Sequence, residues 1–136
     1  MDILELKNII QSNGVVGAGG AGFPSYAKLN EGIDTIILNC AECEPLLKLH
    51  QQLLALKAGE IVNTLNYIAS VIGAKEVVIA TKECYVKTVE AIEAAIEERI
   101  FQVNVKLSFL PEIYPAGDEI ITIYETTGRL VEPGKL

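Results

Sequence analysis

Residues 33–38 read Ile33-Asp-Thr-Ile-Ile-Leu38, a short apolar run that is rich in β-branched side chains. A run of this kind is typical of a strand that is buried on both faces of a parallel sheet. The stretch 76–81 repeats the pattern, and residues 103–109 alternate apolar and polar side chains, as a strand nearer an edge does. We therefore predict three strands, over 33–38, 76–81 and 103–109.

Around these strands the apolar residues recur at helical spacing. Residues 2–13 predict a first helix, with Asp2 and Glu5 spaced as a capping box. A second helix is predicted over 46–72, broken near Ala58-Gly59. The third, over 85–101, is expected to turn these side chains inward: Val89, Ile92, Ile96 and Ile100.

The last helix is predicted to begin after Asp118 as its N-cap and to end at Gly128. We expect its apolar stripe to consist of Ile120, Ile123, Tyr124 and Thr127. Strands that alternate with helices predict right-handed crossovers and a parallel sheet. The fold class is therefore α/β: a single three-layer, Rossmann-like domain with a short, mainly parallel sheet flanked by helices.

Composition narrows the function classes. The 136 residues carry a net charge of −7, which argues against a protein that binds nucleic acid through its phosphates. No apolar run approaches the length of a transmembrane helix, and Asp2 and Glu5 stand where a signal peptide would carry positive charge. Three cysteines without a secretory signal indicate the reducing cytoplasm.

A glycine-rich loop follows the first predicted helix. Gly17-Ala-Gly-Gly-Ala-Gly22 matches the spacing of a dinucleotide fingerprint, although a helix precedes it where the fingerprint requires a strand. The loop is either a connector between closely packed elements or a backbone surface for a flat or anionic ligand. So many glycines raise the entropy that folding must overcome, which favours the ligand.

A polar run, Asn39-Cys-Ala-Glu-Cys-Glu-Pro45, follows the first predicted strand. Ligands of open parallel sheets lie at the carboxyl ends of the strands, so this run is a candidate site. Its Cys-x-x-C spacing also allows thiol-redox or metal chemistry. The neighbouring glutamates would raise a thiol pKa, however, and Cys84 and His50 are the only further thiol or imidazole ligands for zinc. We expect Cys84 to be a small buried side chain.

Three stretches together resemble a known family. They are Gly17-Ala-Gly-Gly-Ala-Gly-Phe-Pro-Ser-Tyr-Ala-Lys28, Asn39-Cys-Ala-Glu-Cys-Glu-Pro45 and Tyr114-Pro-Ala-Gly-Asp-Glu119. In this order and spacing they resemble the FMN- and NADH-binding domain of respiratory flavoproteins. That family includes the NADH-oxidising flavoprotein of complex I, the C component of the Rnf electron-transport complex, cobalamin reductase, and the electron-transfer partner of proline reductase.

The resemblance implies a role for each matching position. The glycines would line the flavin with backbone, Lys28 would contact FMN and Phe23 would stack on the adenine of NADH. The remaining residues would border or close the flavin site. The full set of implied cofactor-binding residues is Gly17, Gly19, Gly20, Gly22, Phe23, Lys28, Asn39, Glu42, Cys43, Glu44, Tyr114, Gly117, Asp118 and Glu119.

Gly-Gly-Ala-Gly-Phe-Pro with Glu-Cys-Glu-Pro is closer to the Rnf and cobalamin-reductase branch. The complex I pattern would have Arg at Ala18, Asp at Ala41 and Ser at Cys43. The two alanines remove polar contacts of that branch, so the residues favour FMN as cofactor more than NADH as donor. Family members also continue beyond position 136, into an Asn-rich FMN-phosphate segment and iron–sulfur segments. The chain is thus expected to be a truncated amino-terminal domain that alone binds FMN weakly or not at all.

The resemblance implies a flavin-dependent electron-transfer module. FMN would accept hydride from NADH and pass electrons to iron–sulfur centres elsewhere in the protein or complex. The alternative is a docking domain that keeps the fold without the flavin. Implied partners are other electron-transfer subunits, with a homo-oligomer left open. The implied location is the cytoplasm, including the cytoplasmic face of a membrane complex.

Overall fold

The computed structural model describes residues 1–17, 21–42, 44 and 46–134. Its elements are α1 (Ile3–Ser12), the 3-10 helix η1 (Ser25–Lys28), β1 (Thr35–Asn39), α2 (Leu49–Ile72), β2 (Glu76–Lys82), α3 (Val86–Glu97), β3 (Asn104–Leu110) and α4 (Glu119–Thr127). Among the helices that can be described, none is long and apolar enough to cross a membrane.

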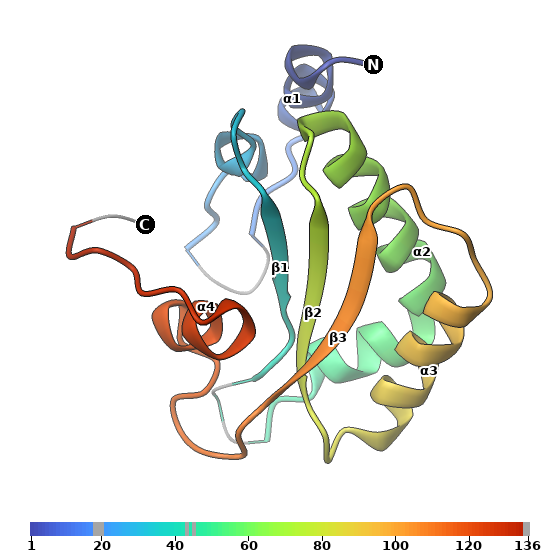
Figure 1. The fold of residues 1–136 in the computed structure, drawn as a ribbon, viewed down its shortest axis with the longest axis vertical. Coiled ribbons are helices and arrows are strands. Elements are labelled where there is room, and N and C mark those ends of the chain that lie inside the picture. Colours follow the sequence, from blue (N-terminus) through green and yellow to red (C-terminus); the bar gives the residue numbers. More distant parts are fainter. Residues whose placement is uncertain (18–20, 43, 45, 135–136) are drawn as a thin grey trace.

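The three strands form one parallel sheet in the order β1-β2-β3. Ile37 of β1 pairs with Val78 of β2, which in turn pairs with Lys106 of β3. Helices α2 and α3 lie on one face of the sheet and α4 lies on the other (Figure 1). A parallel sheet between two helical layers confirms the predicted α/β class.

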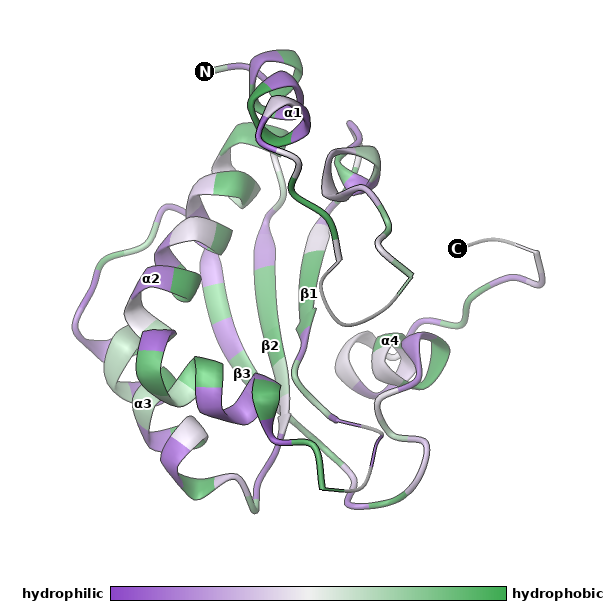
Figure 2. Ribbon diagram, turned by 180° about the vertical axis from the view of Figure 1, so that it is seen from behind, coloured by the Kyte–Doolittle hydropathy of each residue, from purple (hydrophilic) through white to green (hydrophobic). Residues whose placement is uncertain are grey.

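The core is organised around β2, whose middle is hydrophobic in Figure 2 and whose residues Val77 to Ala80 are fully buried. Alternate side chains of a strand point to opposite faces. Ile79 therefore packs toward α2 and α3, in a cluster with Leu54 and Ile92, while Ala80 packs on the opposite side with Leu110. The continuous apolar run of β2 thus covers both faces, as predicted.

The first strand differs from its prediction in place and extent. It covers Thr35–Asn39 and lies at an edge of the sheet, where all five residues are only partly buried. The predicted packing on both faces is present, since Leu38 packs with the Ile79 cluster and Ile37 with the Ala80 cluster, but the burial is only partial. A short apolar run does not reveal the order of strands. The order places β2 in the centre, and both neighbours become edges.

Helix boundaries follow the predicted signals in part. The Asp2 carboxylate accepts from the Glu5 amide at 2.8 Å, so it caps α1. Helix α2 begins at Leu49, three residues later than predicted, and its non-helical residue Lys57 stands just before the predicted break. Gly73 ends this helix with a φ of +77°, a left-handed conformation that glycine adopts without strain.

Three side-chain predictions were wrong. Helix α3 ends at Glu97, so Ile100 lies beyond it and is exposed, and Cys84 is exposed as well. On α4 the buried residues are Thr122 and Thr126, not the predicted stripe, whose Ile120 and Tyr124 are about half exposed.

The two buried side chains of α4 are the threonines Thr122 and Thr126. Each threonine hydroxyl finds a carbonyl: Thr122 donates to Ala116 at 3.2 Å and Thr126 donates to Thr122 at 2.6 Å. Burial of these polar groups is therefore compensated by hydrogen bonds.

Candidate functional site

Asn39 joins two segments that are far apart in sequence. It is the last residue of β1, and its Nδ2 donates to the Gly117 carbonyl at 2.7 Å. Its Oδ1 accepts from the Ala41 amide at 3.1 Å. One side chain therefore fixes the turn after β1 and the loop before α4 at the carboxyl edge of the sheet.

A hollow of about 130 Å³ lies beside this junction. Tyr114 stands at its rim with a side chain that is 82% exposed, and the Tyr114–Pro115 peptide is cis. The volume equals that of about four water molecules, so the hollow is small. Its lining residues, which with Asn39 and Asp118 we call the carboxyl-edge site, are Glu42, Lys82, Glu112, Ile113, Tyr114, Pro115, Ala116 and Gly117.

Glu42 caps helix α2 although it lies outside the helix, eight residues before the amide that it binds. Its Oε1 accepts from the His50 amide at 2.7 Å, and its Oε2 accepts from Gln51 Nε2 at 3.4 Å. Lys48, at the N-cap position, makes no side-chain hydrogen bond to the helix. The Glu42 side chain is only 5% exposed, so most of its surface is taken up by the protein.

Asp118 caps helix α4 as predicted. Its Oδ1 accepts from the amides of Ile120 at 3.0 Å and Ile121 at 3.3 Å. Glu119 follows in the first turn with an exposed side chain, and Glu44 is exposed too. Of the acidic residues assigned to the cofactor, Glu42 and Asp118 therefore already bond to helix amides.

The residues on either side of the glycine-rich loop pair with each other, and we call the segment 15–25 the glycine hairpin. An antiparallel bridge joins Val16 to Pro24. The Gly17 amide donates to the Phe23 carbonyl at 2.9 Å, and the Ser25 amide donates to the Val15 carbonyl at 3.1 Å. The predictions for Gly19, Gly20 and Cys43 lie outside the described residues.

Phe23 and Lys28 form a group of their own at the base of the hairpin. The Lys28 Nζ lies 5.5 Å from the centre of the Phe23 ring, and the ring is 51% exposed. The described parts of the hairpin lie beside β1 in both Figure 1 and Figure 2. The structure thus offers an exposed aromatic face and a cation on the side of the sheet where β1 forms the edge.

Cys40 is unsuited to thiol chemistry. It is almost fully buried, and its thiol lies 3.7 Å from the Leu38 carbonyl. Burial, together with the charge of Glu42, raises the pKa of Cys40 to about 12. Because the thiolate is the reactive form, this environment argues against Cys40 as a redox nucleophile.

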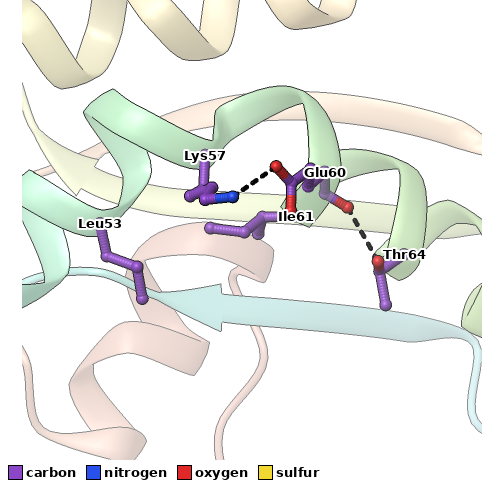
Figure 3. A pocket seen from close by; sticks show the side chains of 5 residues that line it. All are labelled: Leu53, Lys57, Glu60, Ile61 and Thr64. Carbon is purple, nitrogen blue, oxygen red and sulfur yellow. Dashed lines mark hydrogen bonds and ion pairs between the residues drawn. The ribbon is translucent and has the colours of Figure 1, made fainter.

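A larger hollow of about 340 Å³ opens where α2 bends at Lys57 (Figure 3). Leu53 and Ile61 supply apolar walls, and Lys57 pairs with Glu60 at 2.7 Å. No residue assigned by the sequence lines it, and its two charged side chains neutralise each other. We therefore place the candidate site at the smaller hollow, which the predicted residues Glu42, Tyr114 and Gly117 line.

Sequence reasoning missed several residues of the carboxyl-edge site. Lys82 ends β2 at the same edge as Asn39, so the rule that ligands bind at strand ends would have found it. Glu112 and Ile113 belong to the loop before α4, where no periodic pattern marks a role. The capping role of Glu42 depends on contacts eight and nine residues away, which no local motif encodes.

Known proteins match most of the chain. A family model described as the Nuo51 FMN-binding domain matches residues 10–136. Two relatives named cobalamin reductase PduS are 41% identical over 135 residues in Citrobacter freundii and 42% identical over 132 residues in Salmonella typhimurium. They cover 99% and 97% of this chain, which matches 29% and 28% of their lengths.

A third relative is the C component of a proton-translocating ferredoxin:NAD(+) oxidoreductase complex from Clostridium ljungdahlii. It is 31% identical over 140 residues, which span all of this chain and 30% of the relative. The fold is similar to that of an NAD+-reducing NiFe-hydrogenase crystallised in the H2-reduced state, with a TM-score of 0.73 and 22% identity over 90% of this chain and 24% of that one. The chain thus spans less than a third of the length of each of these relatives.

Proposed function

Because this chain belongs to the Nuo51 FMN-binding domain family, we propose that its carboxyl-edge site and glycine hairpin bind FMN for electron transfer. The observation that carries the proposal is the bond from Asn39 Nδ2 to the Gly117 carbonyl. It unites two of the three stretches that resemble the family, at the edge where parallel sheets bind ligands. When bound, FMN can take up two electrons and release them singly.

The residues of the site fit a flavin in a specific way. A hollow of about 130 Å³ is smaller than the roughly 300 Å³ or more that encloses a drug-sized ligand, so only an edge of the ring would enter it. The rest of the ring would lie against the glycine hairpin, whose backbone presents a surface with few side chains. Lys28 would then supply a cation for the FMN phosphate, because ammonium groups form strong charge-assisted bonds to phosphate.

NADH is our proposed electron donor, and iron–sulfur centres in the same protein or complex are our proposed acceptors. One relative is named as part of a ferredoxin:NAD(+) oxidoreductase complex, which supports a nicotinamide partner. The half-exposed ring of Phe23 offers a stacking surface for adenine. By the same relationship, we propose that the domain works beside other electron-transfer subunits, on the cytoplasmic side of a membrane complex.

NMR titration of the 136-residue chain with FMN up to millimolar concentration tests the proposal even if binding is weak. We expect the amide signals of Gly17, Gly22, Asn39 and Gly117 to shift together. Lys28→Gln should weaken FMN binding about tenfold or more, because a hydrogen bond to a charged group contributes about 1.5–3 kcal/mol.

Two controls sharpen this titration. Lys57→Gln removes a lysine at the larger hollow and should leave FMN binding unchanged. Riboflavin has the same ring but no phosphate, so its binding should be insensitive to Lys28→Gln. If millimolar FMN shifts none of these signals, and a version of the chain extended through the following segment does not bind FMN either, a docking domain becomes the better description.

A further inference from the structure

Given the proposed FMN site, we infer that Glu42 is a positioning residue: its carboxylate fixes the first turn of α2 against the wall of the hollow and does not hydrogen-bond the flavin. The family resemblance assigns Glu42 to the cofactor. In the structure, both of its oxygens are turned to α2. This role rests on the proposed function: within the same site, Glu42 supports the wall of the hollow and makes no direct contact with the flavin.

The helix needs this carboxylate. The first amides of any helix lack partners within the helix, and a side chain at the N-cap normally supplies one. Lys48 occupies that position in α2 and makes no such bond. Glu42 replaces the missing cap through the His50 amide at 2.7 Å, and the positive end of the helix dipole favours its negative charge.

The same carboxylate has little surface left for a ligand. Its side chain is 5% exposed, whereas Glu44, two residues later, is exposed. A group that bonds to a flavin must present an oxygen to the open part of the hollow. Glu42 instead contributes to the wall of the hollow, and the rim is formed by the exposed Tyr114.

Hydrogen bonds and one peptide link connect this cap to the rest of the site. Asn39 bonds to the Gly117 carbonyl and to the Ala41 amide, and Ala41 directly precedes Glu42. At the other end, the Gln51 carbonyl accepts from the Thr88 hydroxyl at 2.9 Å, which ties the first turn of α2 to α3. Release of the cap should therefore disturb the loop that lines the hollow.

Two variants remove the same hydrogen bond from opposite ends. Glu42→Ala removes the acceptor. His50→Pro leaves the carboxylate in place and removes the backbone donor, together with the imidazole whose Nδ1 lies 4.0 Å from Glu42 Oε1. Proline is tolerated in the first turn of a helix. Glu42→Gln keeps an acceptor for the His50 amide and removes the charge, and the side-chain amide of Gln51 can rotate to match it. Glu93→Gln, on the exposed side of α3 and outside the site, is the control for loss of an exposed charge.

Two readouts separate the outcomes. Without ligand, we expect Glu42→Ala and His50→Pro to shift the Gly117 and Tyr114 amide signals alike, and Glu42→Gln and Glu93→Gln to shift them little. With FMN, we expect about tenfold weaker binding for the first two variants, no further loss in the double variant, and less than about threefold for the last two.

The inference is overturned if His50→Pro leaves FMN affinity unchanged while Glu42→Ala and Glu42→Gln both weaken it, because that pattern describes a direct ligand. It is also overturned if the unliganded Gly117 signal moves in neither Glu42→Ala nor His50→Pro. Absence of FMN binding by both the unmodified chain and a version extended through the following segment would refute the proposed function alone, since the unliganded spectra still decide the role of Glu42.

Discussion

The carboxyl-edge site and the glycine hairpin are held together in opposite ways. At the carboxyl edge, side chains make the connections: Asn39 joins two loops, and Glu42 and Asp118 each cap a helix. In the hairpin, two backbone hydrogen bonds and one bridge close the described part, and Phe23 and Lys28 are exposed. A cofactor would thus meet one preorganised wall and one surface whose shape depends on backbone conformation.

This difference separates two kinds of polar residue that look alike in a sequence. Carboxylates at a strand end can bind a ligand or satisfy the backbone of a nearby helix, and Glu42 and Asp118 do the second. The exposed groups at the base of the hairpin have fewer protein partners and remain free to contact a ligand. Changes at the carboxyl edge should therefore affect stability, and changes in the hairpin should depend on local backbone geometry.

The largest effect is expected for Asn39→Leu. The leucine keeps the size of the side chain but removes both hydrogen bonds, leaving the Gly117 carbonyl and the Ala41 amide without partners. We expect the free energy of unfolding to fall by about 2–3 kcal/mol, because each abandoned polar group costs about 1–3 kcal/mol when it is not solvated. Urea denaturation measures this change.

Asn30→Leu is the matched control for this substitution. Asn30 is exposed, and its Nδ2 makes one long bond of 3.5 Å to the Ala27 carbonyl. Its loss should change stability by less than about 0.5 kcal/mol. Equal effects at positions 39 and 30 would show that the carboxyl edge is not held by Asn39.

The second effect is a pH dependence at the same edge. Burial raises the pKa of Cys40 from 9.0 to about 12, so the folded state keeps the thiol neutral while the unfolded state ionises. This contribution to stability is complete below pH 9 and is lost as the pH rises from 9 toward 12. At pH 10, one unit above the pKa of the thiol in the unfolded chain, the free energy of unfolding should be lower by about 1.4 kcal/mol.

Cys40→Ala isolates this contribution from every other pH-dependent contribution to stability. We expect urea denaturation at pH 8 and pH 10 to show a smaller loss of stability in the alanine variant than in the unmodified chain. Parallel losses in the two proteins would mean that the Cys40 thiol ionises in the folded state as readily as in the unfolded one.

Much of this fold could be predicted from the sequence, because the spacing of apolar residues and the helix caps depend on residues that are close together in the chain. The three strands, the cap at Asp2 and the cap at Asp118 were all predicted. Strand order could not be predicted, since pairing is decided by contacts across the sheet, and β1 therefore proved to be an edge. The inward stripe of α4 was wrong because the buried positions are Thr122 and Thr126, whose hydroxyls find carbonyl partners that apolar periodicity does not reveal.

The candidate site was predictable to a similar degree. The position of Asn39 at a strand end is visible in the alternation of elements, and the family resemblance supplied the loop before α4. Whether a carboxylate contacts a cofactor or a helix amide depends on distances that no spacing rule contains. Glu42 shows this most clearly, since its partners His50 and Gln51 belong to a helix that was predicted to start earlier.

The smallest effect is expected in the hairpin, where two glycines form a matched pair. Gly22 has a φ of +68°, in the left-handed region, and a Cβ added there would meet nothing within 4 Å. Gly22→Ala should therefore cost about 1 kcal/mol of stability from backbone conformation alone. Gly17 has no positive φ, and an added Cβ would contact the Phe23 backbone at an ordinary 3.8 Å.

Gly17→Ala should accordingly be neutral or slightly stabilising, because alanine reduces the entropy of the unfolded chain without strain in the folded one. Thermal denaturation of the two variants measures the difference, with the unmodified chain as reference. If both substitutions are neutral, the hairpin adjusts its backbone freely and glycine is not required at position 22 for folding. If Gly17→Ala is the more harmful of the two, close packing rather than backbone conformation determines the shape of the hairpin.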